Sequence, residues 1–579
     1  MAAPFLNERF TFTNPDGSTV EVIGSGNQFF AHFETDDGYT VVKDPQSGFY
    51  TYAEITNDKD LSPVSNAIVG KVDPASLNLE KHVRASASVA RGVASTSNLL
   101  QGPEPRWKKR REEKKAQQMR SLNAGLSAGP MLAPTVGNYV GLCILIEFPD
   151  VPQTISRQEV TDFCNKTGYS GYGNNGSVKD YFFDNSRGRL TYTNVVTQYY
   201  TATHNRSYYT DPAIGFGTRA RQLIVEALNH LKAQGFNFAQ LTSDGSGYIY
   251  ALNVFYAGAR VNNWSEGLWP HQWSLASTFD AGGGKKFSDY QITNMGSTLA
   301  LRTFCHENGH MICNFPDLYD YDSGANSSYG IGHFCLMCYG GSDLNPVQVG
   351  AYLKNEAGWS TSLTTITPGI TASLNATNNE FYIHSKNATE YFIVENRQRT
   401  GRDSSLPDAG LAIWHVDENG NNSHQQMTAA QHYECSLEQA DNLFDMERLV
   451  NGGDANDLFG SPGNTQFNDT SSPNSKWWDN TNSDLKITEI SAPGAIMTFK
   501  ALGNAGWVYG KKVSYVSADD STKWAHTIID GYPGWRRIRP TSTDGITNML
   551  VILKTAVAYK RNVNVLFEAN GEVSGVYMS

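Results

Sequence analysis

The pattern of apolar and polar positions in the central part of the chain predicts both strands and helices. Residues 140–148, VGLCILIEF, form an almost continuous apolar run that predicts a buried strand. Residues 219–232 instead repeat apolar side chains at helical spacing, at Ile224, Leu228 and Leu231. The largely apolar residues 299–305 then predict a helix buried under a cleft. Together these elements predict an α+β unit whose sheet floors that cleft.

Short β-type runs separated by turn residues dominate the two ends of the chain. They occupy residues 29–42, 48–53, 380–384, 391–395, 410–416, 550–553 and 563–567. At 579 residues the chain exceeds the size at which one core stops growing, about 250 to 300 residues. We therefore expect four units: a β-rich N-terminal unit with a basic linker (1–125), the α+β unit (137–365), a β-rich unit packed on it (366–502) and a small all-β C-terminal unit (503–579).

Composition narrows the classes of partner. Charged residues make up only 18% of the chain, and its formal net charge is -11. This negative charge argues against a general surface for binding nucleic acids or anionic membranes. It is compatible with acidic loops that bind structural Ca²⁺. No run of about 18 apolar residues predicts a membrane span. The oligomeric state stays open.

A change of composition separates the N-terminal unit from the α+β unit. Residues 86–97 are poor in large apolar side chains, residues 106–115 (RWKKRREEKK) concentrate basic ones, and residues 121–134 are rich in Gly, Ala and Pro. One interpretation of the basic run is a solvated face or helix. The other is an exposed interdomain linker that trypsin-like proteases cut.

The strongest chemical motif is His306-Glu307-Asn308-Gly309-His310. Residues four apart share one face of a helix, so His306 and His310 can place two imidazoles on one Zn²⁺ ion. Glu307 lies beside that face, where a general base is needed to take a proton from water at the metal. A chance match on a solvated helix is the alternative, and the apolar residues before His306 argue against it.

Residues 306–322, HENGHMICNFPDLYDYD, resemble the HExxH-plus-PDLYD signature of the secreted immune inhibitor A-like metalloproteases, a metzincin-like group. Further stretches are similar to the same family and extend the resemblance over roughly residues 30–500: 146–150, 178–182, 185–188, 269–271, 357–359, 394–397 and 410–417. The resemblance implies a metzincin-like zinc metalloprotease catalytic domain at residues 137–365, a small N-terminal prosegment, export from the cell and polypeptide as the substrate.

The third metal ligand is where this sequence departs from the family pattern. In metzincin-type sites the helix ends at a residue with positive φ, usually Gly, and a ligand follows three residues later. Here Cys313 occupies the usual Gly position, and Asn314, which tolerates a left-handed conformation, comes next. A helix one residue longer would make Asp317 the third ligand. Asp320 and His333 remain alternatives.

Several other residues have competing interpretations. Met337 resembles the methionine of the metzincin Met-turn, and Tyr339 stands where some metzincins carry a tyrosine that stabilises the tetrahedral intermediate, although a core tyrosine explains it equally well. His271, between two tryptophans, reads as a packed core residue. His415 and Asp417 could approach the cleft, with a structural role as the default. The seven cysteines are interpreted as small buried side chains, with a disulfide or a second metal site as alternatives.

These observations predict a zinc-dependent endopeptidase that is made as a latent precursor. The alternative is an extracellular adhesin or carbohydrate-binding protein built on a protease-like scaffold. The first residues show no signal peptide, so secretion is implied by the resemblance alone. We expect residues 1 to about 125 to block the site. No cysteine precedes Cys143, which leaves a carboxylate (Glu34, Asp36 or Asp37), a histidine (His32) or plain steric cover.

Overall fold

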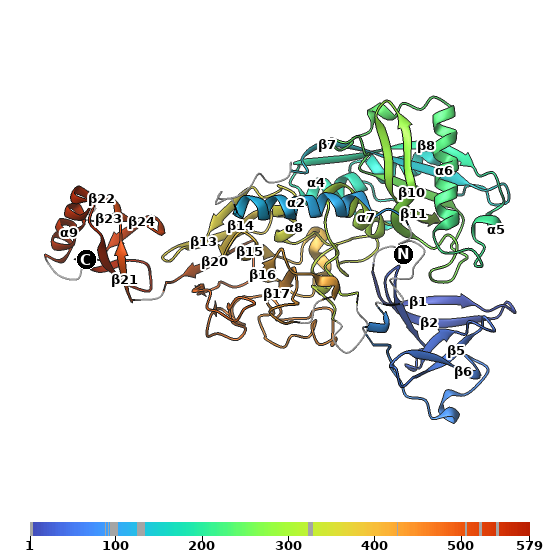
Figure 1. Ribbon diagram of the computed structural model, residues 1–579, viewed down its shortest axis with the longest axis horizontal. Helices are drawn as coiled ribbons and strands as arrows, with labels where there is room; N and C mark the ends of the chain where they lie inside the picture. The colour runs from blue at the N-terminus through green and yellow to red at the C-terminus, as the bar shows by residue number, and fades with distance from the viewer. Residues whose placement is uncertain are drawn as a thin grey trace.

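The computed structural model describes residues 4–86, 88–90, 92, 102–123, 134–321, 328–424, 427–503, 506–519, 524–539 and 544–579. Five sheets with intervening helices follow one another along an elongated molecule (Figure 1), so the α+β class is confirmed. The short 3₁₀ helices are η1 (Pro74–Leu77), η3 (Gly171–Gly173), η4 (Phe238–Gln240), η5 (Gly332–Phe334), η6 (Gly401–Ser405) and η7 (Asn422–His424). Among the helices of the described residues, none is both long and apolar enough to cross a membrane.

The first sheet is an antiparallel meander at the N-terminal end. Its strands, in order, are β1 (Phe5–Thr13), β2 (Thr19–Gly26), β3 (Ala31–Glu34), β4 (Thr40–Lys43), β5 (Tyr50–Ile55) and β6 (Leu61–Ile68). Alternating side chains such as Phe10 and Phe12 are buried, as a half-exposed strand requires. Phe10 lies 5.7 Å, ring centre to ring centre, from Trp269 of the second unit. The N-terminal sheet therefore shares a core with the α+β unit.

The second sheet carries the candidate site. Its order is β10-β11-β9-β7-β8, formed by β7 (Gly137–Glu147), β8 (Leu190–Thr201), β9 (Leu252–Ala257), β10 (His271–Gly282) and β11 (Lys285–Met295). Neighbouring strands are parallel except at the edge, where β10 runs antiparallel to β11. Strand β7 is buried on both faces, which explains the apolar run at residues 140–148.

Helices cover both faces of this sheet. They are α3 (Arg157–Asn165), α4 (Val178–Asn185), α5 (Arg206–Tyr209), α6 (Thr218–Ala233), α7 (Leu301–Cys313) and α8 (Ala351–Glu356). The core on one face of β7 includes side chains of α3, α4 and α7, and the core on the other face includes those of α6. The Ser156 side chain accepts a hydrogen bond from the Glu159 N–H and so caps the start of α3.

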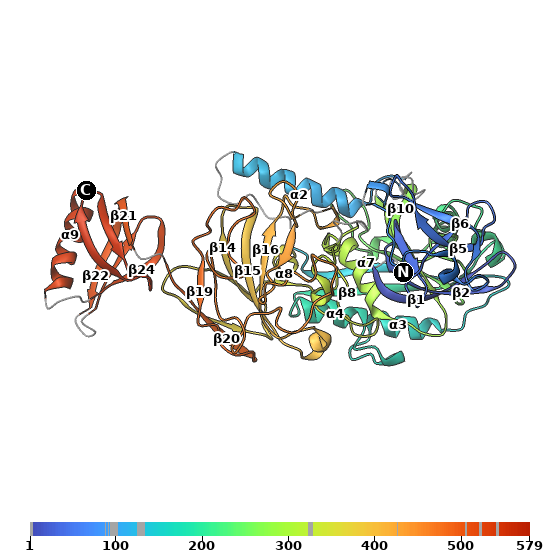
Figure 2. The same ribbon diagram turned by 90° about the horizontal axis from the view of Figure 1, so that it is seen from below.

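The basic run is a docked helix, so its interpretation as an exposed linker is wrong. It forms the start of α2 (Arg106–Asn123), which lies along one side of the molecule from the region of β10 toward β14 (Figure 2). Trp107, Arg110, Arg111 and Lys114 are all buried, whereas Glu112 and Glu113 are exposed. Spacings of three, four and seven residues put these buried side chains on one helical face. That face is basic where an ordinary buried stripe would be apolar.

Two sheets form a sandwich behind α7 and α8. One has the order β12-β14-β15-β16-β17 and the other β13-β20-β19-β18. Their strands are β12 (Ser362–Thr365), β13 (Thr371–Asn375), β14 (Glu380–Ser385), β15 (Glu390–Arg397), β16 (Gly410–Asp417), β17 (Cys435–Leu437), β18 (Phe467–Asn468), β19 (Lys486–Thr488) and β20 (Ile496–Ala501). Ile393 and Trp414 face the core that contains α7, whereas Phe392 and Ile413 face the core shared with the sheet β13-β20-β19-β18. The sheet β12-β14-β15-β16-β17 is thus packed against the site-bearing unit.

The C-terminal unit is not all-β. Its sheet contains β21 (Gly506–Lys511), β22 (Val513–Asp519), β23 (Trp524–Ile529), β24 (Tyr532–Ile538), β25 (Val563–Phe567) and β26 (Val573–Met578). One face packs against α9 (Gly545–Tyr559), which buries Met549, Leu553 and Ala556. The run 550–553 was predicted to be a strand. A short apolar run fits either element, and the four- and seven-residue spacing of the buried side chains is the helical signal.

Candidate metal centre

Helix α7 places the HExxH residues in the interior of the molecule. From Leu301 to Cys313 every side chain except Thr303 is buried. The helix ends at Asn314, which has left-handed backbone angles (φ 59°, ψ 29°) and whose N–H returns to the carbonyl of His310. The prediction of a helix one residue longer, stopped by Asn314, is confirmed. The chain then turns back toward the helix through Phe315.

The turn brings a carboxylate to the two histidines. Asp317 Oδ1 lies 3.1 Å from His306 Nε2 and 3.2 Å from His310 Nε2, and the two Nε2 atoms are 3.2 Å apart. Ligands held about 2.0 to 2.1 Å from a tetrahedral metal ion are separated by roughly 3.3 Å. The three atoms therefore form one face of a tetrahedron, and the site is compatible with a metal ion that keeps its fourth position open. A second possible set of ligand atoms, from His306, Glu307 and His310, lies within 4.8 Å of one another and does not include Asp317.

Backbone carbonyls fix the orientation of both imidazoles. His306 Nδ1 lies 3.0 Å from the carbonyl oxygen of Leu336, and His310 Nδ1 lies 2.6 Å from that of Phe315. A proton on each Nδ1 satisfies these carbonyls and leaves the Nε2 lone pairs for a metal ion. Below the helix, a Cβ atom on Gly309 would meet Met337 Sδ at 2.8 Å. Glycine at this position lets Met337 pack directly against the HExxH turn.

The two carboxylates of the site have different environments. Glu307 is 2% exposed, its Oε1 has no hydrogen-bond partner among the described residues, and burial raises its pKa to about 8. For Asp317, burial acts in the same direction, but when the imidazoles of His310 and His306 are protonated, their charges and hydrogen bonds outweigh it and hold the pKa of Asp317 below its usual range. The Tyr321 hydroxyl donates to the other oxygen of Asp317. Asp317 is held as an acceptor, whereas Glu307 is left free to exchange a proton.

The alternative ligands lie elsewhere. The Asp320 carboxylate accepts a hydrogen bond from Ser328, and His333 Nδ1 contacts the carbonyl of Tyr339. The Tyr339 side chain lines a neighbouring cavity with His333, so its proposed role in stabilising an intermediate stays a prediction. Two tyrosines that the sequence interpretation passed over, Tyr319 and Tyr321, line the pocket of the metal residues themselves. Their position in the PDLYDY run, beside Asp317, was the available signal.

The N-terminal region fills this pocket. Its lining includes Gln28 and Phe29 from the turn after β2 and Trp107 and Lys108 from α2, and only about 10 Å³ of space remains. The Trp107 indole lies parallel to the imidazole of His310, with ring centres 4.5 Å apart and an angle of 20° between the planes. These N-terminal side chains are thus two aromatic rings, an amide and a cation.

The residues that the sequence analysis offered as blocking groups are not the ones in the pocket. Glu34 pairs with Arg84 and His82, and Asp36 pairs with Arg9 at the surface. Neither these carboxylates nor Asp37 or His32 line the pocket. Steric cover, the remaining alternative, stays a prediction. A tryptophan inside a strongly basic run was the signal that sequence reasoning missed.

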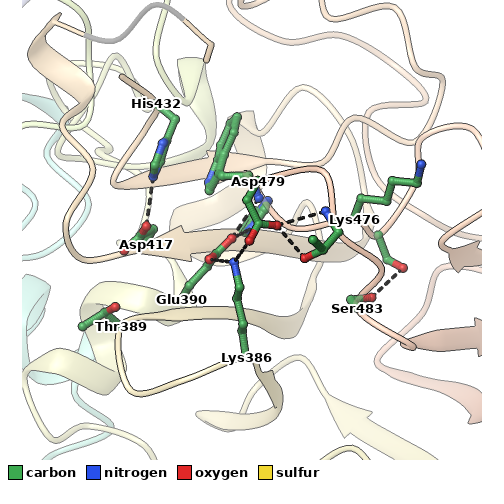
Figure 3. A network of polar contacts seen from close by, with 12 residues as sticks. Lys386, Thr389, Glu390, Asp417, His432, Lys476, Asp479 and Ser483 are labelled. Atoms are coloured by element: carbon green, nitrogen blue, oxygen red, sulfur yellow. Dashed lines mark hydrogen bonds and ion pairs between the residues drawn. The ribbon is translucent and has the colours of Figure 1, made fainter. Parts of the chain in front are cut away.

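Other predicted features lie away from the pocket. His271 is fully buried and contacts the Trp269 carbonyl and the Tyr290 hydroxyl, which confirms a packed core histidine. His415 lies between the carboxylates of Glu390 and Glu438 in the sandwich, and this polar network is drawn in part in Figure 3. Its role is therefore structural. The seven cysteines lie in the described part of the chain, where all are buried and unbridged.

A second group of possible metal ligands lies in the loops after β17. Oxygen atoms of Asp441, Asp454 and Asp457 come within 4.8 Å of one another. Asp457 accepts a hydrogen bond from the Asp454 N–H, so part of the cluster is held by its own backbone. Structural Ca²⁺ was left open for acidic loops in general and was assigned to no residues.

Comparison with known proteins adds no assignment: no family model and no curated protein matches this chain.

Proposed function

We propose that this chain is a zinc-dependent endopeptidase whose N-terminal region keeps it latent. The observation that carries the proposal is the triangle of His306 Nε2, His310 Nε2 and Asp317 Oδ1, at 3.1 to 3.2 Å, beside the unpartnered carboxylate of Glu307. Two neutral imidazoles and one carboxylate are a ligand set of catalytic zinc sites, which leave one position open. The identity of the metal as zinc rests on this ligand set and on the family resemblance.

The chain's own residues divide the chemistry between them. When bound, Zn²⁺ would polarise the scissile carbonyl and make water a stronger acid. Glu307, buried beside the triangle with its Oε1 unpartnered among the described residues, takes the proton of the attacking water and passes it to the leaving amine. Asp317, held by Tyr321, stays ionised and keeps the two imidazoles in place. Tyr319 and Tyr321 line the space where the reacting carbonyl would lie.

Polypeptide as the substrate class is supported by the edge strand next to the site. β10 is the last strand of its sheet, and at Gln272 its backbone N–H and C=O both point away from β11. The side-chain amide of Gln28 occupies both groups: its Nε2 donates to the Gln272 carbonyl at 2.9 Å, and its Oε1 accepts from the Gln272 N–H at 3.0 Å. This pair of hydrogen bonds is the one that an extended peptide makes with an exposed edge.

The docking of α2 supports latency. The carboxylate of Asp289 accepts from the Arg106 and Trp107 N–H groups at the start of the helix. Further along, Arg110 Nε donates to Asn314 Oδ1 and its Nη2 to the Met311 carbonyl, both at 2.7 Å. Arg110 therefore holds the end of the HExxH helix itself.

A second set of ion pairs extends the docked face. Arg111 pairs with Glu434, and Lys114 pairs with Glu356. Removing one partner of such a buried pair leaves the other charge buried and unpaired, which is costly. The pairs therefore keep α2 docked, and with it Trp107 over His310. Activation then requires α2 to leave, and a cut within its buried face is not available to a protease until it does.

The experiment that tests the function measures metal and turnover together. Purified chain is loaded with zinc, its metal content is determined by mass spectrometry, and hydrolysis of casein-type substrate is followed before and after limited proteolysis. We expect about one zinc per chain and hydrolysis that Glu307→Gln abolishes without loss of metal. Zinc-loaded chain that hydrolyses no peptide before or after release of its N-terminal region would refute the proposal. Secretion rests on the resemblance alone.

One observation favours the adhesin alternative. The C-terminal unit leaves a set of large aromatic side chains 40% to 63% exposed: Trp507, Tyr515, Trp524, Trp535 and Tyr577. Two pairs among them are in contact, Trp507 with Tyr577 at 5.0 Å and Tyr515 with Trp535 at 6.4 Å between ring centres, and contiguous exposed apolar groups mark interaction sites. Retention of the Glu307→Gln chain on a polysaccharide column, lost when Trp524 and Trp535 are replaced by alanine, would favour a binding role for this unit.

A further inference from the structure

Arg302 places a positive charge next to the metal site. It lies four residues before His306 in α7, so Arg302, His306 and His310 follow one another along the same face of the helix. The residue is only 6% exposed. The face of α7 that carries the metal ligands therefore carries a buried cation one turn away.

The guanidinium of Arg302 is incompletely paired. Its Nη2 donates to the Pro4 carbonyl at 3.0 Å, whereas its Nη1 is 3.7 Å from Glu8 Oε1 and 3.9 Å from Asp343 Oδ1. Its Nε is buried and has no hydrogen-bond partner among the described residues. A buried cation without a close, hydrogen-bonded counter-charge is expensive. Glu8 and Asp343 lie within ion-pair distance of Arg302 but too far to hydrogen-bond it, so the guanidinium can still accept a closer anion.

A cavity opens in front of this cation. It has a volume of about 410 Å³, in the range of sites that bind small groups, and Arg302, His333, Tyr339 and the loop residues Gly341, Ser342 and Asp343 form one wall. The opposite wall is the N-terminal segment with Leu6, Glu8 and Arg9. The Tyr339 ring lies 5.9 Å from that of Tyr319, which lines the metal pocket. The cavity therefore adjoins the site of the proposed reaction.

We propose that Arg302 selects substrates with an aspartate or glutamate side chain close to the scissile bond, an inference that rests on the proposed peptidase function. Glu8 and the Pro4 carbonyl stand in for that substrate, since they bring a carboxylate and a peptide carbonyl to the guanidinium from one extended segment. When the N-terminal region leaves, Asp343 is the remaining acidic neighbour. Its side chain is 53% exposed and 3.9 Å away, so water screens it and it leaves the guanidinium available.

The first test is a cleavage profile. Zinc-loaded full-length chain, after limited proteolysis, is incubated with a library of peptides from a digested proteome, and the cleaved bonds are identified by mass spectrometry. We expect Asp and Glu to be enriched at one fixed position relative to the scissile bond. A peptide with Glu at that position should be cleaved at least tenfold more efficiently than its Gln counterpart, because only the carboxylate forms a charge-assisted hydrogen bond with the guanidinium.

Variants of Arg302 separate a role in selection from a role in folding. Arg302→Met keeps the length and loses the charge, so the Glu-to-Gln ratio should fall to near one, and Arg302→Lys should retain part of it. Arg189, an exposed arginine that contacts the Gly358 carbonyl, gives a matched control: Arg189→Met should leave the profile unchanged. A readout without turnover uses the zinc-loaded Glu307→Gln chain after the same limited proteolysis, which should bind the Glu peptide at least tenfold more tightly than the Gln peptide in calorimetric titration.

The outcomes distinguish this inference from the function on which it rests. Peptide hydrolysis with no acidic enrichment, or enrichment that survives in Arg302→Met, would overturn the role of Arg302 and leave the peptidase function standing. Hydrolysis of no peptide by the wild-type chain would overturn both. If Arg302→Met does not fold, the wild-type profile and the Glu-to-Gln binding ratio still decide, since equal binding of the two peptides contradicts the proposal.

Discussion

The contact between Trp107 and His310 offers a sharp perturbation of latency. Trp107 is 5% exposed, and its indole is stacked on a proposed metal ligand with ring centres 4.5 Å apart. Trp107→Ala removes this cover but keeps the ion pairs of Arg111 and Lys114 that anchor α2 further along. The substitution should therefore weaken the docked state of α2, while these ion pairs still favour docking over release.

The size of the effect follows from burial and stacking. Replacing a buried tryptophan by alanine costs about 3 to 5 kcal/mol, of which the aromatic contact itself contributes about 0.5 to 1.5 kcal/mol. With about 3 kcal/mol lost from the docked state of α2, the population with an open pocket should rise about 100-fold. Activity cannot exceed that of chain whose N-terminal region has been removed.

The assay compares peptide hydrolysis by zinc-loaded chain before and after limited proteolysis. Wild-type chain should gain activity on proteolysis, whereas Trp107→Ala should begin at least tenfold above untreated wild type and gain correspondingly less. Lys109→Ala, an exposed position on the same helix, is the matched control and should behave as wild type. If untreated Trp107→Ala were no more active than untreated wild type while proteolysis activated both, Trp107 would not be the blocking group.

Two further predictions concern the metal ligands and the acidic surface under α2. Asp317→Ala should lower zinc content strongly, whereas Asp320→Ala and His333→Ala should leave it near normal; full occupancy in Asp317→Ala would reassign the third ligand. Burial, and then the charge of Glu356, raise the pKa of Glu418 to about 7 in the folded chain. The protonated carboxyl therefore contributes fully to the stability of the folded chain below about pH 4.5, and this contribution is lost as pH rises through 7. Glu418→Gln should stabilise the chain by about 2 kcal/mol at pH 8 and less at pH 5; equal melting shifts at both pH values would contradict this.

Much of the candidate site was accessible from the sequence because its geometry is local. Helical spacing fixes the relation between His306 and His310, and the tolerance of Asn314 for positive φ fixes where the turn to Asp317 begins. The buried strand at residues 140–148 and the helix at residues 219–232 were predictable for the same reason. A continuous apolar run indicates the strand, and apolar residues at helical spacing indicate the helix.

The features that escaped prediction depend on contacts between distant parts of the chain. A basic run such as residues 106–115 is solvated by default, and it becomes a buried helix face here through partners far away in the sequence, among them the carboxylates of Glu356 and Glu434, more than 240 residues away. The partnership of Gln28 with Gln272 spans 244 residues. Helix α9 was missed for a different reason, because a four-residue apolar run does not distinguish strand from helix.

The central claim is that Glu307 acts as the base beside a metal held by His306, His310 and Asp317. The most direct measurement determines zinc content and peptide hydrolysis of wild-type and Glu307→Gln chain side by side, after limited proteolysis. The amide is nearly the same size but cannot accept a proton, so the account predicts equal zinc, an unchanged melting temperature and turnover lower by at least a hundredfold. Near-native turnover by a zinc-loaded Glu307→Gln chain would contradict it.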